Sequence, residues 1–438
     1  MEVLYERCCG LDIHKRTVVA CLLTPGPGGR PTKAIRTFGT MTEELLGLAD
    51  WLQAAGCTHV AMEATGVYWQ PIWNLLEDRF TLLLANARHI KAVPGRKTDA
   101  RDCEWLADLL RHGLLQGSVV PPRPQRELRE LTRYRSSLVE ERSAEVNRLQ
   151  KTLEGANIKL AAVATDTLGK SGRAMLEALV SGTLPPAAMA ELARGRMREK
   201  IPQLEQALTG RFGAHQRFLV ARQLAHIDAL DALILEVSEE IARRLRTADD
   251  AAAAARPLAA EEGEAAEGPP ARPVEDAVAR LDTIPGVGRR TAEVLVAELG
   301  LDLARFPTAR HLASWAGMCP GNHERAGKRH SGKTRQGNRA LRAALVEAAQ
   351  AAGRSKRTYL GAQFRRLAAR RGKKRAAVAV GHTILVIVYH LLTEGSIYQD
   401  LGPQYFDARD RQRVERRLVH RLEALGYRVT LESTTSAA

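Results

Sequence analysis

The chain contains few cysteines for its length, and their spacing matches no metal-binding pattern. The six are Cys8, Cys9, Cys21, Cys57, Cys103 and Cys319, and no two are separated as Cys-x-x-Cys. Scattered cysteines in apolar segments argue against a disulfide framework and a structural zinc site. We therefore expect a reducing, cytoplasmic location.

We expect no secretory leader, and the sequence contains no long hydrophobic run. Glu2, Glu6 and Asp12 interrupt the N-terminal segment. The most apolar stretch, residues 376–392, has 17 residues and includes Gly381 and two histidines. A membrane span needs about 20 predominantly apolar residues. We expect this stretch to be a buried helix of a soluble protein with no membrane partner.

Acidic residues are almost absent between Arg325 and Thr393. The segment holds 17 lysines and arginines and a single acid, Glu347, so its net charge of +16 exceeds the +15 of the whole chain. The rest of the chain is therefore close to neutral. A local basic block predicts a polyanion partner such as a nucleic acid. A solvated basic surface is the alternative, which the lack of interleaved acids disfavours.

A length of 438 residues predicts two or three domains. Pro121, Pro122 and Pro124 mark a first boundary, and residues 249–275, rich in Ala, Glu and Pro, are typical of a disordered linker. The expected division is an N-terminal domain at 1–120, a helical arm at 121–248, the linker at 249–275, a C-terminal domain at 276–400 and a tail at 401–438.

Strand and helix signals alternate in the N-terminal domain. Two β-prone runs, 8–13 and 17–23, are joined by a short polar turn, which predicts a hairpin, and residues 34–38 are a candidate third strand. The segments that follow predict helices at 42–55 and 69–77 and strands at 57–62 and 80–85. This order favours an α/β domain with a mixed sheet flanked by helices.

Four acids lie at the edges of these elements. Thr98 is a candidate N-cap for a helix running to Leu110, on which Asp99 and Asp102 are three residues apart and share a face. Asp12 and Glu63 stand near the ends of predicted strands. Carboxylate clusters suit Mg²⁺, and a pair of such ions supports in-line phosphoryl displacement. The plainer alternatives are solvated turn acids and a first helical turn enriched in Asp by the helix dipole.

Leucines at near-heptad spacing predict a long amphipathic helix over about 128–153, and a second helix is expected over about 201–245. Together they predict an antiparallel coiled-coil arm. The arm could serve dimerisation or simply pack as a core, and the sequence leaves both readings open.

The C-terminal domain begins with a glycine-rich turn. Residues 281–288, Leu-Asp-Thr-Ile-Pro-Gly-Val-Gly, lead into a helix and resemble a helix-hairpin-helix, in which the backbone at Gly286 and Gly288 would approach a phosphate. An ordinary turn between two helices is the alternative. Residues 327–334 match a P-loop pattern, but no apolar strand precedes them, so an ATP site is not expected. Phosphate contacts are expected instead from the basic residues of this half: Arg325, Lys328, Lys333, Arg335, Lys373, Lys374 and Arg375.

Taken in order, Gly-Leu-Asp12, Met-Glu63-Ala-Thr-Gly and Lys-Thr-Asp99-Ala-Arg-Asp102 resemble the Asp-Glu-Asp-Asp set of RuvC-like nucleases with an RNase H fold. More narrowly, they resemble the DEDD insertion-sequence transposases related to the Piv invertase, which are bridge-RNA-guided recombinases. The resemblance continues in the C-terminal half through residues 315–324, 337–342 and 359–375.

This resemblance implies that Asp12, Glu63, Asp99 and Asp102 bind Mg²⁺, and that the partners are DNA, a non-coding guide RNA and further copies of the chain in a dimer or tetramer. It also implies a serine that attacks DNA and forms a 5′-phosphoserine link, at a position where this chain has Arg325. An arginine can hold a phosphate but cannot be the nucleophile. Ser331, six residues on, is the candidate substitute.

We therefore expect a transposase, a Mg²⁺-dependent DNA recombinase of an insertion sequence. One alternative is a structure-specific nuclease that uses water as its nucleophile. The other is a nucleic-acid-binding protein that no longer cleaves DNA, which Arg325 makes credible.

Overall fold

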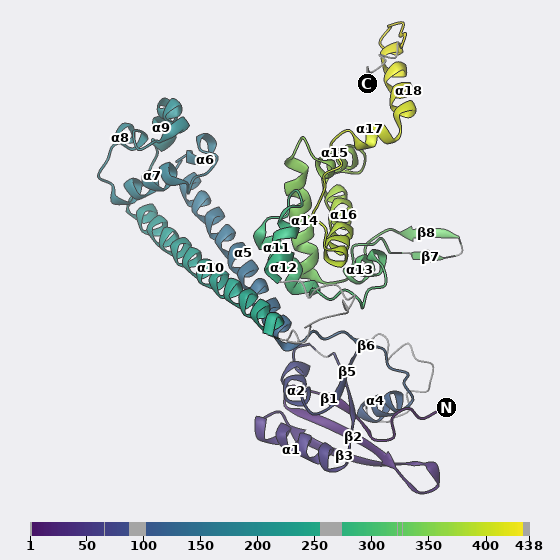
Figure 1. Cartoon of the computed structure of the whole chain (residues 1–438). Coiled ribbons are helices and arrows are strands. Elements are labelled where there is room, and N and C mark those ends of the chain that lie inside the picture. Colours follow the sequence, from purple (N-terminus) through teal and green to yellow (C-terminus); the bar gives the residue numbers. More distant parts are fainter. Residues whose placement is uncertain are drawn as a thin grey trace, which may run out of the picture. The chain divides into compact units, whose positions relative to one another are not determined.

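The computed structural model describes residues 2–64, 66–86, 102–254, 274–321, 323–325 and 327–431 (Figure 1). For residues 249–254, 323–325 and 328–331 it describes the backbone only. Contacts divide the chain into two compact units, Met1–Pro122 and Arg123–Ala438. The boundary falls within the proline-rich segment where the sequence predicts one.

The first unit is built on a mixed sheet, as the sequence predicts, with six strands where the sequence indicates five. The strands are β1 (Cys8–Ile13), β2 (Thr17–Pro25), β3 (Pro31–Gly39), β4 (His59–Glu63), β5 (Thr81–Ala85) and β6 (Gly117–Ser118), in the order β3-β2-β1-β4-β5-β6. β1, β2 and β3 form an antiparallel meander, whereas β4 and β5 run parallel to β1. The two-residue edge strand β6 had no sequence signal, since strands are recognised by longer runs.

Helices cover both faces of the sheet. Alternate residues of β1 point to opposite faces. Cys9, Leu11 and Ile13 pack with α1 (Thr42–Ala54) and α2 (Trp69–Leu76), while Cys8 packs with α4 (Asp102–Arg111). Residues 87–101, which include the predicted N-cap Thr98, lie outside the described residues. Gly10 and Asp12 therefore belong to the face that α4 covers.

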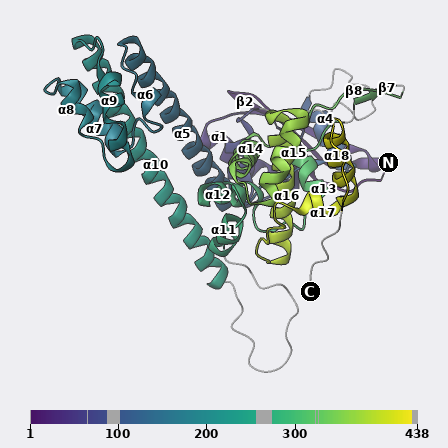
Figure 2. The same ribbon diagram turned by 90° about the horizontal axis from the view of Figure 1, so that it is seen from above.

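The second unit begins with the predicted antiparallel arm. The long helices α5 (Arg123–Gly155) and α10 (Ala214–Ala254) run side by side, and small helices pack at their far end (Figures 1 and 2). These are α6 (Leu160–Val163), α7 (Lys170–Ser181), α8 (Pro186–Ala190), η2 (Gly195–Lys200) and α9 (Ile201–Leu208).

Two expectations about the arm are wrong. The helix predicted over 201–245 is interrupted between Leu208 and Ala214. The interruption contains Gly210, where a Cβ would lie 2.5 Å from the carbonyl oxygen of Ala156, so tight packing of a non-helical segment overrides the apolar period. In addition, α10 continues to Ala254, so the segment that links the arm to the C-terminal domain begins later than residue 249.

The C-terminal part is a helical cluster with one hairpin. Its elements are α11 (Val274–Asp282), α12 (Arg289–Leu299), α13 (Ala309–Trp315), β7 (His323–Arg325), β8 (Lys328–Ser331), α14 (Arg339–Arg354), α15 (Tyr359–Arg371), α16 (Lys373–Glu394), α17 (Tyr405–Arg409) and α18 (Arg411–Glu423). By length and composition α16 could cross a membrane. It instead packs against α13, α14 and α15 (Figure 2), with Ile384, Leu385 and Val388 fully buried, as predicted for a core helix.

Candidate functional site

Asp12 and Glu63 occupy equivalent positions on neighbouring parallel strands. Leu11 of β1 is the register partner of Met62 of β4, so the acid that follows each of them takes the next position along the pair. Because side chains at one register position share a face, both carboxyl groups point to the face that α4 covers. The structure thus brings together two acids that are 51 positions apart in the chain.

The N-terminal end of α4 lies over the same part of the sheet. A Cβ at Gly10 would come within 2.3 Å of the Cys103 carbonyl oxygen and 2.5 Å of the Ala107 nitrogen, so the absent side chain lets the helix rest directly on β1. The Cys8 thiol donates to the Ala107 carbonyl at 3.6 Å. Asp102 precedes Cys103 and is the first residue of α4, so it belongs to the helix end that packs on β1.

The negative charge of Asp12 affects the thiol of Cys103 on α4. Burial raises the pKa of the Cys103 thiol, and the nearby Asp12 carboxylate raises it further. The Nε2 atom of His14 lies 3.3 Å from the Asp12 carboxylate, a contact that the sequence analysis did not foresee. Glu104, in the same helical turn as Asp102, is 3.5 Å from the Lys33 ammonium and is already paired.

Asp12, Glu63 and Asp102, together called the acidic edge, carry the carboxylate oxygens that a divalent cation needs as ligands. They are not a complete metal site in the described residues. Within the described ranges, no group of three or more His, Cys, Asp or Glu side chains is close enough to hold a metal ion. Asp99 lies outside the described residues. Two adjacent carboxylates repel each other unless a cation or a proton lies between them, and carboxylate oxygens are the ligands that Mg²⁺ prefers. The chemistry of Asp12, Glu63 and Asp102 therefore fits the ion that the sequence predicts.

Buried thiols lie in the core of the first unit. Burial raises the pKa of Cys8 to about 11 and that of Cys21 and Cys57 to about 12. A thiol held in its neutral form behaves as a small apolar side chain and not as a nucleophile or metal ligand. These cysteines therefore contribute to the apolar packing on the two faces of the sheet.

In the second unit, Arg325 and Ser331 belong to one β-hairpin. Arg325 of β7 pairs with Lys328 of β8 next to the turn, and Ser331 pairs with His323. Arg325 and Ser331 are six residues apart in the chain. Along the direction of the strands they are offset by about two positions, or roughly 7 Å at 3.3 Å per residue. The hairpin also occupies the segment that matches a P-loop, which needs a strand, a loop and a helix in sequence.

The other predicted basic residues are exposed. Lys333 and Arg335 follow the hairpin, and Lys373, Lys374 and Arg375 form the first turn of α16. None of the three α16 cations has an ion pair within the described part of the chain. Their charge is therefore available to a partner.

The two predicted phosphate-binding glycines differ in their surroundings. Gly286 adopts a φ of +91°, and a Cβ there would lie 2.3 Å from the carbonyl oxygen of Ala348 on α14. A glycine is needed here because the α11–α12 turn packs closely on α14. This packing explains the glycine without a contact to nucleic acid. Gly288 is exposed with open space around it and precedes the first turn of α12. Gly288 is thus the more accessible of the two for a phosphate contact, whereas the half-buried Gly286 packs against α14.

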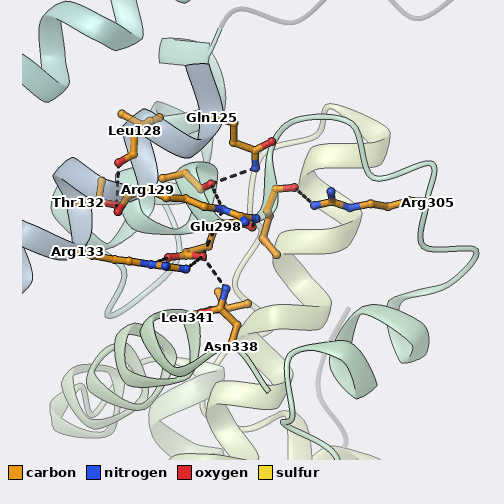
Figure 3. Close-up of polar contacts among 11 residues, drawn as sticks. Gln125, Leu128, Arg129, Thr132, Arg133, Glu298, Arg305, Asn338 and Leu341 are labelled. Atoms are coloured by element: carbon orange, nitrogen blue, oxygen red, sulfur yellow. Dashed lines mark hydrogen bonds and ion pairs between the residues drawn. The ribbon is translucent and has the colours of Figure 1, made fainter. Parts of the chain in front are cut away.

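A buried polar network, which the sequence analysis missed, ties the arm to this helical cluster (Figure 3). Glu298 of α12 is fully buried and accepts two hydrogen bonds from Arg133 of α5, at 2.7 and 2.9 Å. It also accepts one from the Asn338 amide at 2.6 Å and lies 3.4 Å from Arg129. Asn338 in turn caps α14 by accepting from the Leu341 nitrogen. The sequence did contain a signal for this network. Glu298 interrupts an apolar helix, and Arg129 and Arg133 lie on one face of a helix far upstream.

Two protein-family models match the chain. One, described as "Transposase" and labelled as the DEDD type of IS110, matches residues 9–158, and one described as "Transposase IS116/IS110/IS902 family" matches residues 278–365. Together they cover more than half of the 438 residues. The first segment contains all four predicted acids, and the second contains the hairpin.

Similar proteins carry related names. The chain is 25% identical over 350 residues to the "Probable family 20 transposase" of Pseudomonas aeruginosa, which covers 78% of this chain and 85% of the relative. It is 35% identical over 129 residues to a protein of insertion element IS110 of Streptomyces coelicolor, covering 28% of this chain and 30% of the relative. It is 33% identical over 124 residues to the "Transposase for insertion sequence element IS1111A" of Coxiella burnetii, covering 27% and 34%. The chain thus spans about a third of the length of the latter two relatives and most of the first.

Proposed function

This chain belongs to the IS110 family of transposases, and from that premise we propose that it is the DNA recombinase of an insertion sequence, which cleaves and exchanges DNA strands. The observation that carries the proposal is the register that sets Asp12 beside Glu63 beneath the N-terminal end of α4. An acidic edge in one unit and a basic surface in the other are the two parts that metal-assisted chemistry on DNA requires.

The acidic edge is the proposed metal site. Asp12, Glu63 and Asp102, with Asp99, would hold Mg²⁺, which when bound polarises a phosphate and neutralises charge that develops on its oxygens. The strand order β3-β2-β1-β4-β5, with β2 antiparallel to the rest of the central strands, supports an RNase H-like arrangement. His14 would help to orient the Asp12 carboxylate before the cation binds.

The nucleophile is proposed to come from the β7–β8 hairpin. A serine oxygen would form a bond to the DNA phosphorus while the bond from phosphorus to the 3′ oxygen breaks, leaving a 5′-phosphoserine and a 3′ hydroxyl. Arg325 cannot perform this attack, whereas Ser331 has the required hydroxyl and lies on the facing strand. The hairpin brings Ser331 closer to the position of Arg325 than their separation of six residues in the chain suggests. We expect cleavage to be impaired in the unaltered chain, because Ser331 is displaced from Arg325 by about two strand positions and an attacking oxygen must come within roughly 3–3.5 Å of phosphorus.

Further partners follow from the family resemblance. A structured guide RNA would share the basic C-terminal surface, and the α5–α10 arm would join copies of the chain into a dimer or tetramer. A cytoplasmic location accords with both partners. The proposal that Gly288 contacts the nucleic-acid backbone through a helix-hairpin-helix also stands, whereas the packing of Gly286 gives no support to a direct contact there.

Detection of a covalent protein–DNA adduct tests the recombinase. The full chain is incubated with DNA carrying the ends of its own insertion sequence, the RNA that co-purifies with the protein, and Mg²⁺ or EDTA. Adducts that resist denaturation are then separated on a gel. The unaltered protein is compared with Ser331→Ala and Arg325→Ser.

Each alternative function gives a distinct result. An adduct that Ser331→Ala removes identifies Ser331 as the nucleophile and contradicts the expected impairment. An adduct that forms only with Arg325→Ser shows that cleavage was lost with the serine. Mg²⁺-dependent cleavage without an adduct supports the water-using nuclease. Binding without cleavage in every variant supports the non-cleaving protein.

A further inference from the structure

A cavity of about 900 Å³ lies between α14, α15, α16 and the segments that flank the β7–β8 hairpin. Its lining includes five cationic side chains and, among the described residues, no carboxylate: the cations are Lys333, Arg342, Arg371, Lys374 and Arg375. Like charges gathered on one concave surface repel each other and focus a positive potential into it. The cavity is therefore suited to an anionic ligand.

Three of these cations have no acidic partner in the part of the chain that the structure describes. Lys374 and Arg375 lie in the first turn of α16, at the positive end of the helix dipole, where acids are favoured and cations are not. Neither has an ion pair with a described residue. The half-buried Arg342 donates to the Thr334 hydroxyl at 2.7 Å and reaches the Gly317 carbonyl at 3.4 Å, without a described carboxylate. A bound phosphate would relieve all three cations, since helix N-termini and arginines both bind phosphate oxygens.

The remaining walls are apolar. Met318, Leu367 and Val378 line the cavity together with His382, and burial lowers the pKa of His382, which keeps its ring neutral at pH 7. An inorganic phosphate or a backbone phosphate alone would form no favourable contacts with the apolar walls. A nucleobase would form such contacts, because its flat faces are apolar. Its edges can also form hydrogen bonds with a neutral imidazole.

We propose that this cavity binds one unpaired nucleotide of the bound nucleic acid, with the base against Met318, Leu367 and Val378 and the adjoining phosphate against Lys374 and Arg375. The inference rests on the proposed function, because it requires nucleic-acid binding, but it adds recognition of an extruded base. An unpaired base costs least to unstack, so the cavity would mark sites where the duplex is interrupted.

The test compares a short duplex carrying a single bulged 2-aminopurine with the same duplex fully paired, in DNA and in RNA versions, bound to the full chain. We expect roughly tenfold tighter binding of the bulged duplex in at least one of the two nucleic acids, the factor expected from burying one base. The 2-aminopurine fluorescence should change on binding, because the base leaves its stacked neighbours. Preference for one version identifies DNA or RNA as the source of the nucleotide.

A charge-matched pair of variants separates the cavity from general electrostatics. Lys374→Glu and Lys373→Glu change the net charge equally in the same turn of α16, but only Lys374 lines the cavity. Both residues are exposed, so neither change should disturb folding. We expect both variants to bind paired duplex more weakly by similar factors, and only Lys374→Glu to lose the preference for the bulge.

Equal affinity of the unaltered chain for bulged and paired duplexes, or equal loss of the preference in both variants, overturns the inference. Strong binding of paired duplex alone would leave the proposed function standing. A chain that binds neither duplex contradicts the proposed function as well, so the two failures are distinguishable.

Discussion

At the scale of single residues, the acidic edge depends on a strand register that cannot shift by one position. Leu11 and Met62 face the core on one side of the sheet, and the acids that follow them face α4 on the other. A one-residue slip of β4 against β1 would turn Glu63 away from Asp12 and bury it among apolar side chains. Because Leu11 and Met62 are fully buried on the face that α1 and α2 cover, the packing of both strands fixes the side of the sheet on which the acids lie.

Asp102→Asn, made in whichever of the unaltered chain and Arg325→Ser cleaves DNA, should lower strand cleavage and leave nucleic-acid affinity unchanged. The substitution removes a negative charge from the proposed cation site but none of the positive charge that binds phosphate. Cleavage should fall roughly a thousandfold, as expected when several kcal/mol of charge stabilisation is lost. Cleavage assays and gel-shift titrations measure the two effects. Asp108→Asn, near the other end of α4 beside His112, is the matched control and should cleave normally. Equal activity of the two variants would remove Asp102 from the site.

The buried thiols predict both slow alkylation and a loss of stability at high pH. The pKa of Cys8 is raised to about 11 from an ordinary 9.0, so the folded state retains a proton that the unfolded state has already released. The stabilising contribution is complete below pH 9 and is lost as the pH rises towards 11.

In the native chain, iodoacetamide should modify the half-buried Cys319 and spare Cys8, Cys21 and Cys57, as mapped by mass spectrometry. Urea unfolding should show a smaller loss of stability between pH 9 and pH 11 in Cys8→Ala than in the unaltered protein. Rapid native alkylation of Cys8 would contradict the burial on which both predictions depend.

At the scale of elements, buried ion pairs join α12 to the arm, and a hydrogen bond from Asn338 joins it to α14. Glu293 of α12, only 3% exposed, binds Arg135 of α5 at 2.6 Å and Arg289 at 3.1 Å. Burial lowers the pKa of Arg129 to about 10, while the neighbouring Glu298 opposes the shift. These pairs make the base of α5 part of the C-terminal cluster rather than a separate rod.

Glu298→Ala should destabilise the second unit by about 3–5 kcal/mol, because it leaves buried arginines and the Asn338 amide without their acceptor. The urea midpoint of unfolding measures the effect. Glu240→Ala is the control, since Glu240 pairs with Arg243 and Arg244 on the exposed side of α10 and its loss should hardly move the midpoint. Similar midpoints for the two variants would show that the network adds nothing beyond surface pairing.

At the scale of the whole molecule, charge is divided between the two units. The basic block of 325–393 lies entirely in the second unit, whereas the predicted acidic site lies in the first. Nucleic-acid affinity and strand cleavage should therefore respond to different substitutions.

Reversing Lys373, Lys374 and Arg375 to Glu should lower the slope of log affinity against log salt by roughly 0.9 for each phosphate of duplex DNA that the protein no longer neutralises. The control changes the net charge equally on exposed cations of the arm: Lys151, Arg211 and Arg222. Filter binding at several salt concentrations measures the slopes. If the arm variant changes the slope as much as the α16 variant, binding depends on net charge and not on this surface.

The sequence by itself determined the local features of this protein. The β-prone runs at 8–13 and 17–23 and the helix over 42–55 are signals carried by neighbouring residues, and the structure confirms them. Charge counts likewise located the basic block, because net charge does not depend on folding.

Only the tertiary structure decided how distant segments meet. It set Asp12 beside Glu63, broke the second arm helix at Gly210, packed Gly286 on α14 and gathered cations from three helices around one cavity. The buried partnership of Glu298 with Arg133 joins residues 165 positions apart. Such contacts depend on which apolar faces pack together across the whole chain, and local sequence patterns carry no information about that choice.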